Sequence, residues 1–231
     1  MRTFVMGDIH GAYKALKQCL DRSGFRNEHD HLICLGDVAD GWPDVAETID
    51  CLMTLKHHTL LMGNHDVWAL EWMTTGKADE DWVHLGAKST LKSYGNDFNK
   101  VPPEHIAYLK SARQVFAINQ KVFVHAGIDP NEPDLEKQTA ETCLRSRKFI
   151  EEARRKHTSD PGHRFGGWKE IYIGHTPTLH AGTDRPRRLC NVIAMDTGAG
   201  WKGRLSMMNI ATGHFTQSDS VPSLYPGHSS R

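Results

Sequence analysis

The chain has 231 residues, of which 39% are hydrophobic and 24% charged, an ordinary composition for a globular protein. Lysine plus arginine and aspartate plus glutamate both number 28, so the net charge is zero, which argues against a partner held mainly by bulk charge, such as nucleic acid or an anionic membrane. Five widely spaced cysteines predict free thiols, and no apolar run reaches about 18 residues, so we expect a cytoplasmic protein.

The first third of the chain alternates short apolar strands with amphipathic helices. We expect strands at Thr3–Met6, His31–Leu35 and Thr59–Met62, with helices at Ala12–Arg22 and from Pro43 to about Leu55. This β-α-β-α-β order is typical of parallel strands joined by crossover helices.

The pattern then loosens over residues 68–111, where several aromatic residues lie among polar ones. We interpret this segment as a mostly helical cap over one end of the sheet. Beyond it we expect a hairpin, an amphipathic helix and three strands joined by loops: Val115–Ile118 with Lys121–Val124, Thr139–Arg155, and Ile171–Ile173, Val192–Met195 and Leu205–Ile210. The second half should therefore be more antiparallel.

Five of the predicted strands end in a tight turn that carries aspartate, histidine or asparagine. These turns read GDIHG, GDVAD, GNHD, VHAG and GHT, and they contain Asp8, His10, Asp37, Asp40, Asn64, His65, Asp66, His125 and His175. Any one of them is unremarkable as turn chemistry. Together they are best explained by convergence on metal ions, because buried carboxylates and imidazoles are costly unless they are paired or bound.

The residue types narrow the chemistry. Oxygen and imidazole ligands without thiolates favour Mn, Fe or Zn, and three histidines argue against Ca or Mg. At three or four ligands per ion, the set would hold two ions. Two metals about 3.5–4 Å apart with a shared ligand promote in-line phosphoryl displacement by a metal-bound hydroxide.

The ordered motifs, over about residues 3–210, resemble those of the calcineurin-like metallophosphoesterases. Within them, the chain resembles the phosphoprotein-phosphatase branch, which includes bacterial and phage serine/threonine phosphatases and symmetrical diadenosine tetraphosphate hydrolases. The resemblance implies an α/β fold, a four-layer αββα sandwich of mixed sheets with a mostly helical cap. We expect a single domain over 1–218, with the cap at 68–111 and a flexible tail at 219–231.

The resemblance also implies roles for individual residues. Two metal ions, with Mn favoured and Fe or Zn as alternatives, would be bound by Asp8, His10, Asp37, Asn64, His125 and His175, with Asp37 bridging them. His65 would be the general acid that protonates the leaving oxygen, and Asp40 would orient it.

One position departs from the branch. The branch usually has GDxVDRG, whose arginine grips the substrate phosphate, whereas this chain has Gly41 there, followed by Trp42. Arg147 is the candidate for a second phosphate-binding arginine, with Arg145 as the alternative. Arg185, Arg187 and Arg188 either replace the missing cation or form an exposed loop. Trp42 either lines the pocket mouth or, as we favour, packs under the cap.

These features predict a metal-dependent phosphoester hydrolase, acting as a phosphomonoesterase or a protein serine/threonine phosphatase. The alternative is a dinucleoside polyphosphate hydrolase or a phosphodiesterase, and a non-catalytic metal-binding scaffold ranks lower. The expected partner is a phosphorylated substrate (a phosphoprotein, a phosphopeptide or a nucleotide), not a membrane, and nucleic acid is disfavoured.

Overall fold

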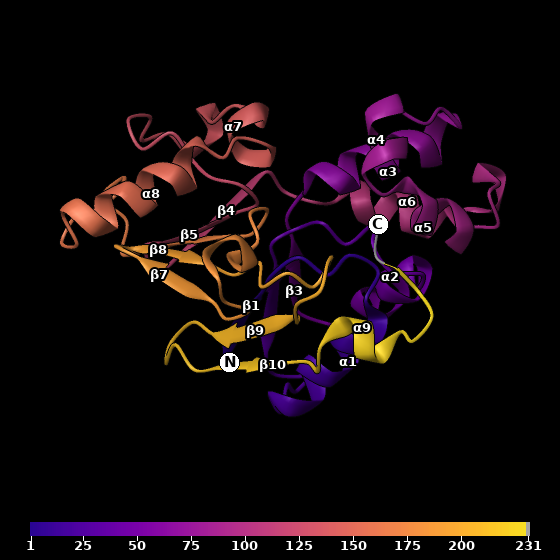
Figure 1. Cartoon of the computed structure of the whole chain (residues 1–231), viewed down its shortest axis with the longest axis horizontal. Coiled ribbons are helices and arrows are strands. Elements are labelled where there is room, and N and C mark those ends of the chain that lie inside the picture. Colours follow the sequence, from indigo (N-terminus) through magenta and orange to yellow (C-terminus); the bar gives the residue numbers. More distant parts are fainter. Residues whose placement is uncertain (230–231) are drawn as a thin grey trace.

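A computed structural model of the protein describes residues 1–229, which form two mixed five-stranded sheets packed face to face (Figure 1). In the first sheet, of order β10-β9-β1-β2-β3, the strands β1, β2 and β3 are parallel, and β9 and β10 are antiparallel additions. Its strands are β1 (Thr3–Met6), β2 (His31–Cys34), β3 (His58–Leu60), β9 (Ser206–Asn209) and β10 (Phe215–Gln217).

The second sheet has the order β4-β5-β6-β8-β7, with a parallel centre and antiparallel edges. Its strands are β4 (Val115–Ile118), β5 (Lys121–Val124), β6 (Glu170–Ile173), β7 (Arg187–Leu189) and β8 (Val192–Ala194). Arg187 and Arg188 therefore lie in an edge strand, where Arg188 pairs with Glu170. This strand and β10, which have three residues each, are not among the strands expected from the sequence.

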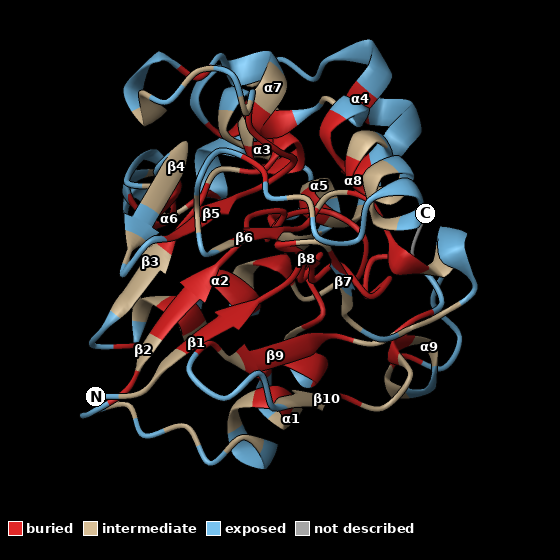
Figure 2. Cartoon of the chain, turned by 90° about the vertical axis from the view of Figure 1, so that its left-hand side faces the viewer, coloured by how far each residue is buried: buried red, intermediate tan, exposed pale blue. Residues whose placement is uncertain are grey.

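The two sheets bury an apolar layer between them. Val5 and Ile33 of the first sheet contribute to it, and Phe123 and Tyr172 of the second stack with ring centroids 5.0 Å apart. In Figure 2 the inner strands are mostly red, meaning buried, whereas the edge strands β4 and β10 are largely tan or blue. Burial on both faces explains why the central strands are continuous apolar runs in the sequence.

Helices complete two outer layers. The helices α1 (Tyr13–Arg22) and α2 (Val45–Met53) share an apolar cluster with the first sheet, and α7 (Ala140–Leu144) and α8 (Lys148–Ser159) share one with the second. Short 3₁₀ turns lie at η2 (Leu135–Lys137) and η3 (Thr178–Ala181). The predicted four-layer αββα arrangement is confirmed.

The segment between β3 and β4 is mostly helical, as expected. It contains α3 (Asn64–Thr75), α4 (Glu80–Leu85), α5 (Ala87–Ser93), η1 (Phe98–Lys100) and α6 (Pro103–Lys110). These helices gather on the side of the molecule away from α7 and α8 (Figure 1). Trp72, Trp82 and Tyr94 anchor them to the apolar cluster of the first sheet.

Two expectations are corrected. The single helix predicted over Thr139–Arg155 is broken between α7 and α8, at residues 145–147. The break frees backbone carbonyls for the site: Cys143 O accepts from Ala126 N at 2.7 Å, and Arg145 O lies 2.9 Å from the Nε2 atom of His175. These contacts outweigh the helical pattern of the sequence.

The C-terminal segment is packed where the sequence suggested a loose tail. The helix α9 (Val221–Leu224) buries Val221, and Tyr225, which is 2% exposed, stacks on Trp42 and donates to Asp44 Oδ2 at 2.7 Å. Residues 230–231 of the predicted tail lie outside the described residues. Among residues 1–229, no helix combines the length and the apolar character that crossing a membrane requires.

Candidate metal centre

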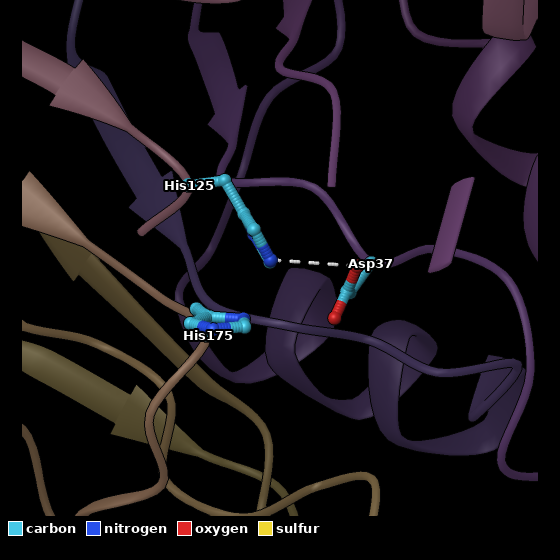
Figure 3. Close-up of side chains that lie close together, drawn as sticks. All are labelled: Asp37, His125 and His175. Atoms are coloured by element: carbon cyan, nitrogen blue, oxygen red, sulfur yellow. Dashed lines mark ion pairs between the residues drawn. The ribbon is translucent and has the colours of Figure 1, made fainter. Parts of the chain in front are cut away.

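The five predicted strand ends converge on one site. Two groups of side chains place their ligand atoms within 4.8 Å of one another: Asp8, His10 and Asp37 in one group, and Asp37, His125 and His175 in the other. Asp37 belongs to both groups, the position expected for a bridging ligand. Figure 3 shows His125 and His175 pointing toward Asp37, with His125 Nε2 3.5 Å from Asp37 Oδ1.

Asn64 joins the second group. It is the first residue of α3, and its Oδ1 atom lies 3.1 Å from Nε2 of His125. The next residue of the helix, His65, donates its backbone N–H to Asp37 Oδ1 at 3.0 Å. A helix N-terminus therefore faces the shared carboxylate, and all six predicted ligand residues lie together.

Backbone carbonyls fix the orientation of the histidine rings. The Nδ1 atoms of His10 and His125 lie 3.0 Å from Ala39 O and 2.8 Å from Leu35 O. In His175 the nitrogen that lies next to a carbonyl is Nε2, which is 2.9 Å from Arg145 O. Because each ring donates a proton to a carbonyl, the other ring nitrogen turns an unprotonated lone pair toward the cluster, as metal-ligating histidines do.

The backbone at the site is held in an uncommon conformation. Four non-glycine residues have left-handed φ values: His10 (51°), Asp37 (51°), Asp40 (68°) and His175 (63°). Such conformations cost about 1–3 kcal/mol each and persist where the surrounding structure imposes them, often at functional sites.

Glycines allow the carboxylates to approach the backbone closely. A Cβ atom at Gly63 would lie 2.2 Å from Asp37 Oδ1, and one at Gly174 would lie 2.1 Å from Asp8 Oδ1. Neither contact is possible for a residue with a side chain, which explains the glycine before the polar group in these turns.

The electrostatics fit divalent cations. Burial, reinforced by the charges of Asp196 and Asp37, raises the pKa of Asp8 well above its usual range. Burial and the neighbouring His125 lower the pKa of His175 to about 4, so this ring is neutral at neutral pH. Carboxylates that repel one another in a buried site, beside neutral imidazoles with inward lone pairs, are stabilised by cations between them.

His65 and Asp40 form the pair that the sequence predicted. Nδ1 of His65 lies 2.6 Å from Oδ2 of the fully buried Asp40. The same carboxylate accepts hydrogen bonds from Trp82 Nε1, at 2.6 Å, and from the hydroxyl of Thr90. Both donors belong to the helical insert, which therefore helps to form the site.

Asp66 has a positioning role that the sequence did not reveal. Its carboxylate accepts the backbone N–H groups of Val38 at 2.8 Å, Ala39 at 3.0 Å and Gly63 at 3.0 Å. These bonds tie the turn after β2 to the first turn of α3, and so fix Asp37 relative to Asn64.

A cavity of about 370 Å³ opens over the cluster, and both candidate arginines, Arg145 and Arg147, line it. The guanidinium of Arg145 lies 4.9 Å from the ring centre of Trp68. Leu85 and Trp201, which are 47% and 43% exposed, add an apolar rim. Arg185, Arg187 and Arg188 are not among the lining residues, so they do not replace the missing cation there.

Asp196 also lines this cavity, although it is not among the site residues expected from the sequence. It follows β8 in the series VIAMDTG. The pattern that predicts the other site residues, a polar residue after an apolar strand with a glycine nearby, is therefore present here as well.

Gly41 and Trp42 face different surroundings. Gly41 has φ 77°, and a Cβ atom there would lie 2.7 Å from the Cβ of His10. Trp42 is 1% exposed, donates to Ala199 O at 2.7 Å and stacks on Tyr225. It is therefore buried, as favoured, but these two partners lie in the C-terminal part of the chain and not in the cap.

The αββα fold and this site together define a metal-centred hydrolase architecture. The family model described as calcineurin-like phosphoesterase matches residues 1–200, and the chain belongs to this family. The family binds a dinuclear divalent metal centre, and the two Asp/His groups found here match that requirement.

Several known proteins are similar to the chain. A symmetrical bis(5'-nucleosyl)-tetraphosphatase of Buchnera aphidicola subsp. Acyrthosiphon pisum (strain Tuc7) is 30% identical over 137 residues, covering 56% of this chain and 46% of the relative. The enzyme of that name from Coxiella burnetii (strain CbuG_Q212) is 25% identical over 214 residues, covering 89% of this chain and 66% of the relative. The chain thus spans about half to two thirds of these relatives.

Among solved structures, a protein assigned provisionally as a diadenosine tetraphosphatase superposes with a TM-score of 0.69 at 19% identity, covering 94% of this chain and 92% of that one. At this identity the likeness supports the fold.

Proposed function

We propose that this protein hydrolyses phosphoric esters at a dinuclear divalent metal centre, with Mn²⁺ as the favoured ion. The observation that carries the proposal is the position of Asp37, which belongs to both groups of ligand atoms. Two ions that share one carboxylate supply a strong nucleophile from water at neutral pH and neutralise the charge of the phosphoryl group.

The ligands divide between the two ions. Asp8, His10 and Asp37 would hold the first, and Asp37, Asn64, His125 and His175 the second. The surrounding carbonyls keep the imidazoles in the tautomer that offers a lone pair to the ion.

His65 would protonate the leaving oxygen, because Asp40 fixes its Nδ1–H and leaves Nε2 to face the substrate. Arg147 would bind the phosphate from the cavity wall, with Arg145 as the alternative. Free thiols are consistent with the proposed cytoplasmic location.

The test is metal analysis combined with turnover of p-nitrophenyl phosphate, with Mn²⁺, Zn²⁺, Mg²⁺ and no added metal in parallel. We expect two ions per chain and turnover with Mn²⁺. Asp37→Asn should lose metal and activity together, because it removes the ligand shared by both ions. A wild-type protein that binds metal without turnover would favour the scaffold alternative, and one with neither bound metal nor turnover would overturn the proposal.

A second candidate for the substrate is a dinucleoside polyphosphate. The relatives in Buchnera and Coxiella carry that name, and the rim formed by Leu85 and Trp201 offers apolar surface to a nucleobase. Parallel assays with a serine phosphopeptide, diadenosine tetraphosphate and bis-p-nitrophenyl phosphate separate this candidate from a protein phosphatase and a phosphodiesterase.

A further inference from the structure

A second cavity lies beside the metal centre and belongs to no part of the proposed chemistry. It has a volume of about 330 Å³, in the range of small-ligand pockets. The ends of α4 and α5, the turn at Gly41 and the segment 227–229 surround it. We call it the lysine pocket.

The ionisable side chains that line the lysine pocket are all basic. Its ionisable lining residues are His84, Lys88, Lys92 and His228, and no aspartate or glutamate of the described chain lines it. The whole chain has zero net charge, so this lining departs locally from the average. The two lysines in this lining would repel a cationic ligand and attract an anionic one.

Lys88 and Lys92 are four residues apart on α5, so they lie on the same face of the helix. Like charges at this spacing repel, and within residues 1–229 neither lysine forms an ion pair. No carboxylate of the described residues pairs with either lysine, so only solvent or a bound anion can offset this repulsion.

The lysine pocket adjoins the site of chemistry. Leu85 lines the cavity over the metal cluster, whereas its chain neighbours His84 and Gly86 line the lysine pocket. Gly41 also lines the lysine pocket, and the preceding residue, Asp40, holds His65. The end of α4 and the turn 40–41 therefore form the wall between the two cavities.

We propose that the lysine pocket is a second anion subsite, which binds a distal phosphate of a substrate that carries a chain of phosphates, while another phosphate lies at the metal centre. The proposal rests on the proposed function and narrows its substrate to the polyphosphate class. Two lysines and two imidazoles give such a chain several charge-assisted contacts, and a substrate with one phosphate would not reach them.

The direct test measures binding of inorganic tripolyphosphate to the full-length protein by calorimetry. Lys88→Ala/Lys92→Ala should weaken binding by about tenfold or more. Both lysines are exposed on a helix surface and alanine is the better helix former, so the fold should survive. Lys77→Ala/Lys110→Ala is the matched control, since these exposed lysines of the insert lie outside the pocket. Equal binding by wild type and the Lys88/Lys92 variant overturns the proposal.

Kinetics separates this inference from the proposed function. In the metal-loaded enzyme, the double variant should raise KM for diadenosine tetraphosphate by about tenfold and leave p-nitrophenyl phosphate unchanged. If the KM values of both substrates rise by the same factor, the lysines act only through their long-range electrostatic field, and the subsite is refuted. If the wild type turns over neither substrate, the proposed function fails, while the tripolyphosphate result still decides whether the pocket binds anions.

Discussion

Trp82 donates its indole N–H to Oδ2 of Asp40 at 2.6 Å, and the same oxygen lies 2.6 Å from Nδ1 of His65. Trp82 is fully buried on α4, in the helical insert, and Asp40 lies in the turn after β2. The insert is therefore connected to the proposed general acid through one carboxylate oxygen. Packing of the insert should influence proton transfer as well as access to the site.

Trp82→Phe keeps most of the buried ring and removes the hydrogen bond. We expect kcat to fall by about tenfold on phenyl phosphate, because Asp40 loses a partner that fixes its position. The fall should be smaller on p-nitrophenyl phosphate, whose better leaving group needs less protonation.

Trp72→Phe is the control for that substitution. Trp72 belongs to the same apolar cluster, and its ring centroid lies 6.4 Å from that of Trp82. Its variant should unfold at a similar temperature to Trp82→Phe yet keep wild-type rates on both substrates. Equal rate losses in the two variants would assign the effect to packing.

Replacing the proposed general acid gives the larger effect. His65→Asn should retain both metal ions and lose about 10²-fold or more in kcat on phenyl phosphate, because the leaving oxygen departs without a proton. Metal analysis distinguishes it from Asp37→Asn. Full activity of His65→Asn on phenyl phosphate would remove His65 from the mechanism.

Much of this site could be predicted because its signal is local. Each ligand follows an apolar strand within a few residues, so strand ends that meet at one sheet edge bring together residues far apart in the chain. The pairing of His65 with Asp40 followed from the family resemblance.

The rest depends on contacts that no local pattern encodes. Trp82 and Thr90 reach Asp40 from 42 and 50 residues away. The break between α7 and α8 results from carbonyls used by neighbouring loops. Tyr225 is buried because Trp42 and Asp44 offer it a ring and a carboxylate, although its sequence context resembles a loose tail.

Gly41→Arg would not restore a phosphate clamp. A side chain at φ 77° is strained, and its Cβ atom would lie 2.7 Å from that of His10, a proposed ligand. We expect lower metal content and lower kcat, with no fall in KM for p-nitrophenyl phosphate. Gly213→Arg is the control, because Gly213 has φ 73° and open space around it. A lower KM in Gly41→Arg would contradict this account.

The two cavity arginines should differ in effect. Arg147→Ala should raise KM for p-nitrophenyl phosphate by about tenfold or more, because a charge-assisted contact with the phosphate is lost. Arg145→Ala keeps the backbone carbonyl that orients His175, and it removes the contact with Trp68. If Arg145→Ala has the larger KM, the clamp is Arg145. Arg155→Ala is the control on α8, where Arg155 pairs with Glu152 at the surface.

Glu170 should make the stability of the fold sensitive to acid. Burial opposes its ionisation, but hydrogen bonds from Lys121, Arg188 and Tyr172 prevail and lower its pKa to about 2. In an unfolded chain the pKa of a glutamate is about 4.3. Because the folded pKa is the lower one, the stabilisation is complete above pH of about 4.3 and is lost as the pH falls toward about 2.

Glu170→Gln tests this directly. At pH 7 it should cost about 1–3 kcal/mol in the free energy of unfolding, because Lys121, which is 8% exposed, loses its charged partner. The cost should shrink as the pH falls through the window between the two pKa values, because the wild-type carboxyl is then protonated as well. Urea unfolding of both proteins at several pH values measures the difference. Glu152→Gln is the control, since that carboxylate forms its ion pair at the exposed surface of α8, where such pairs contribute little. A Glu170→Gln cost that stays constant across this window would show that the buried ion pair does not cause the acid sensitivity.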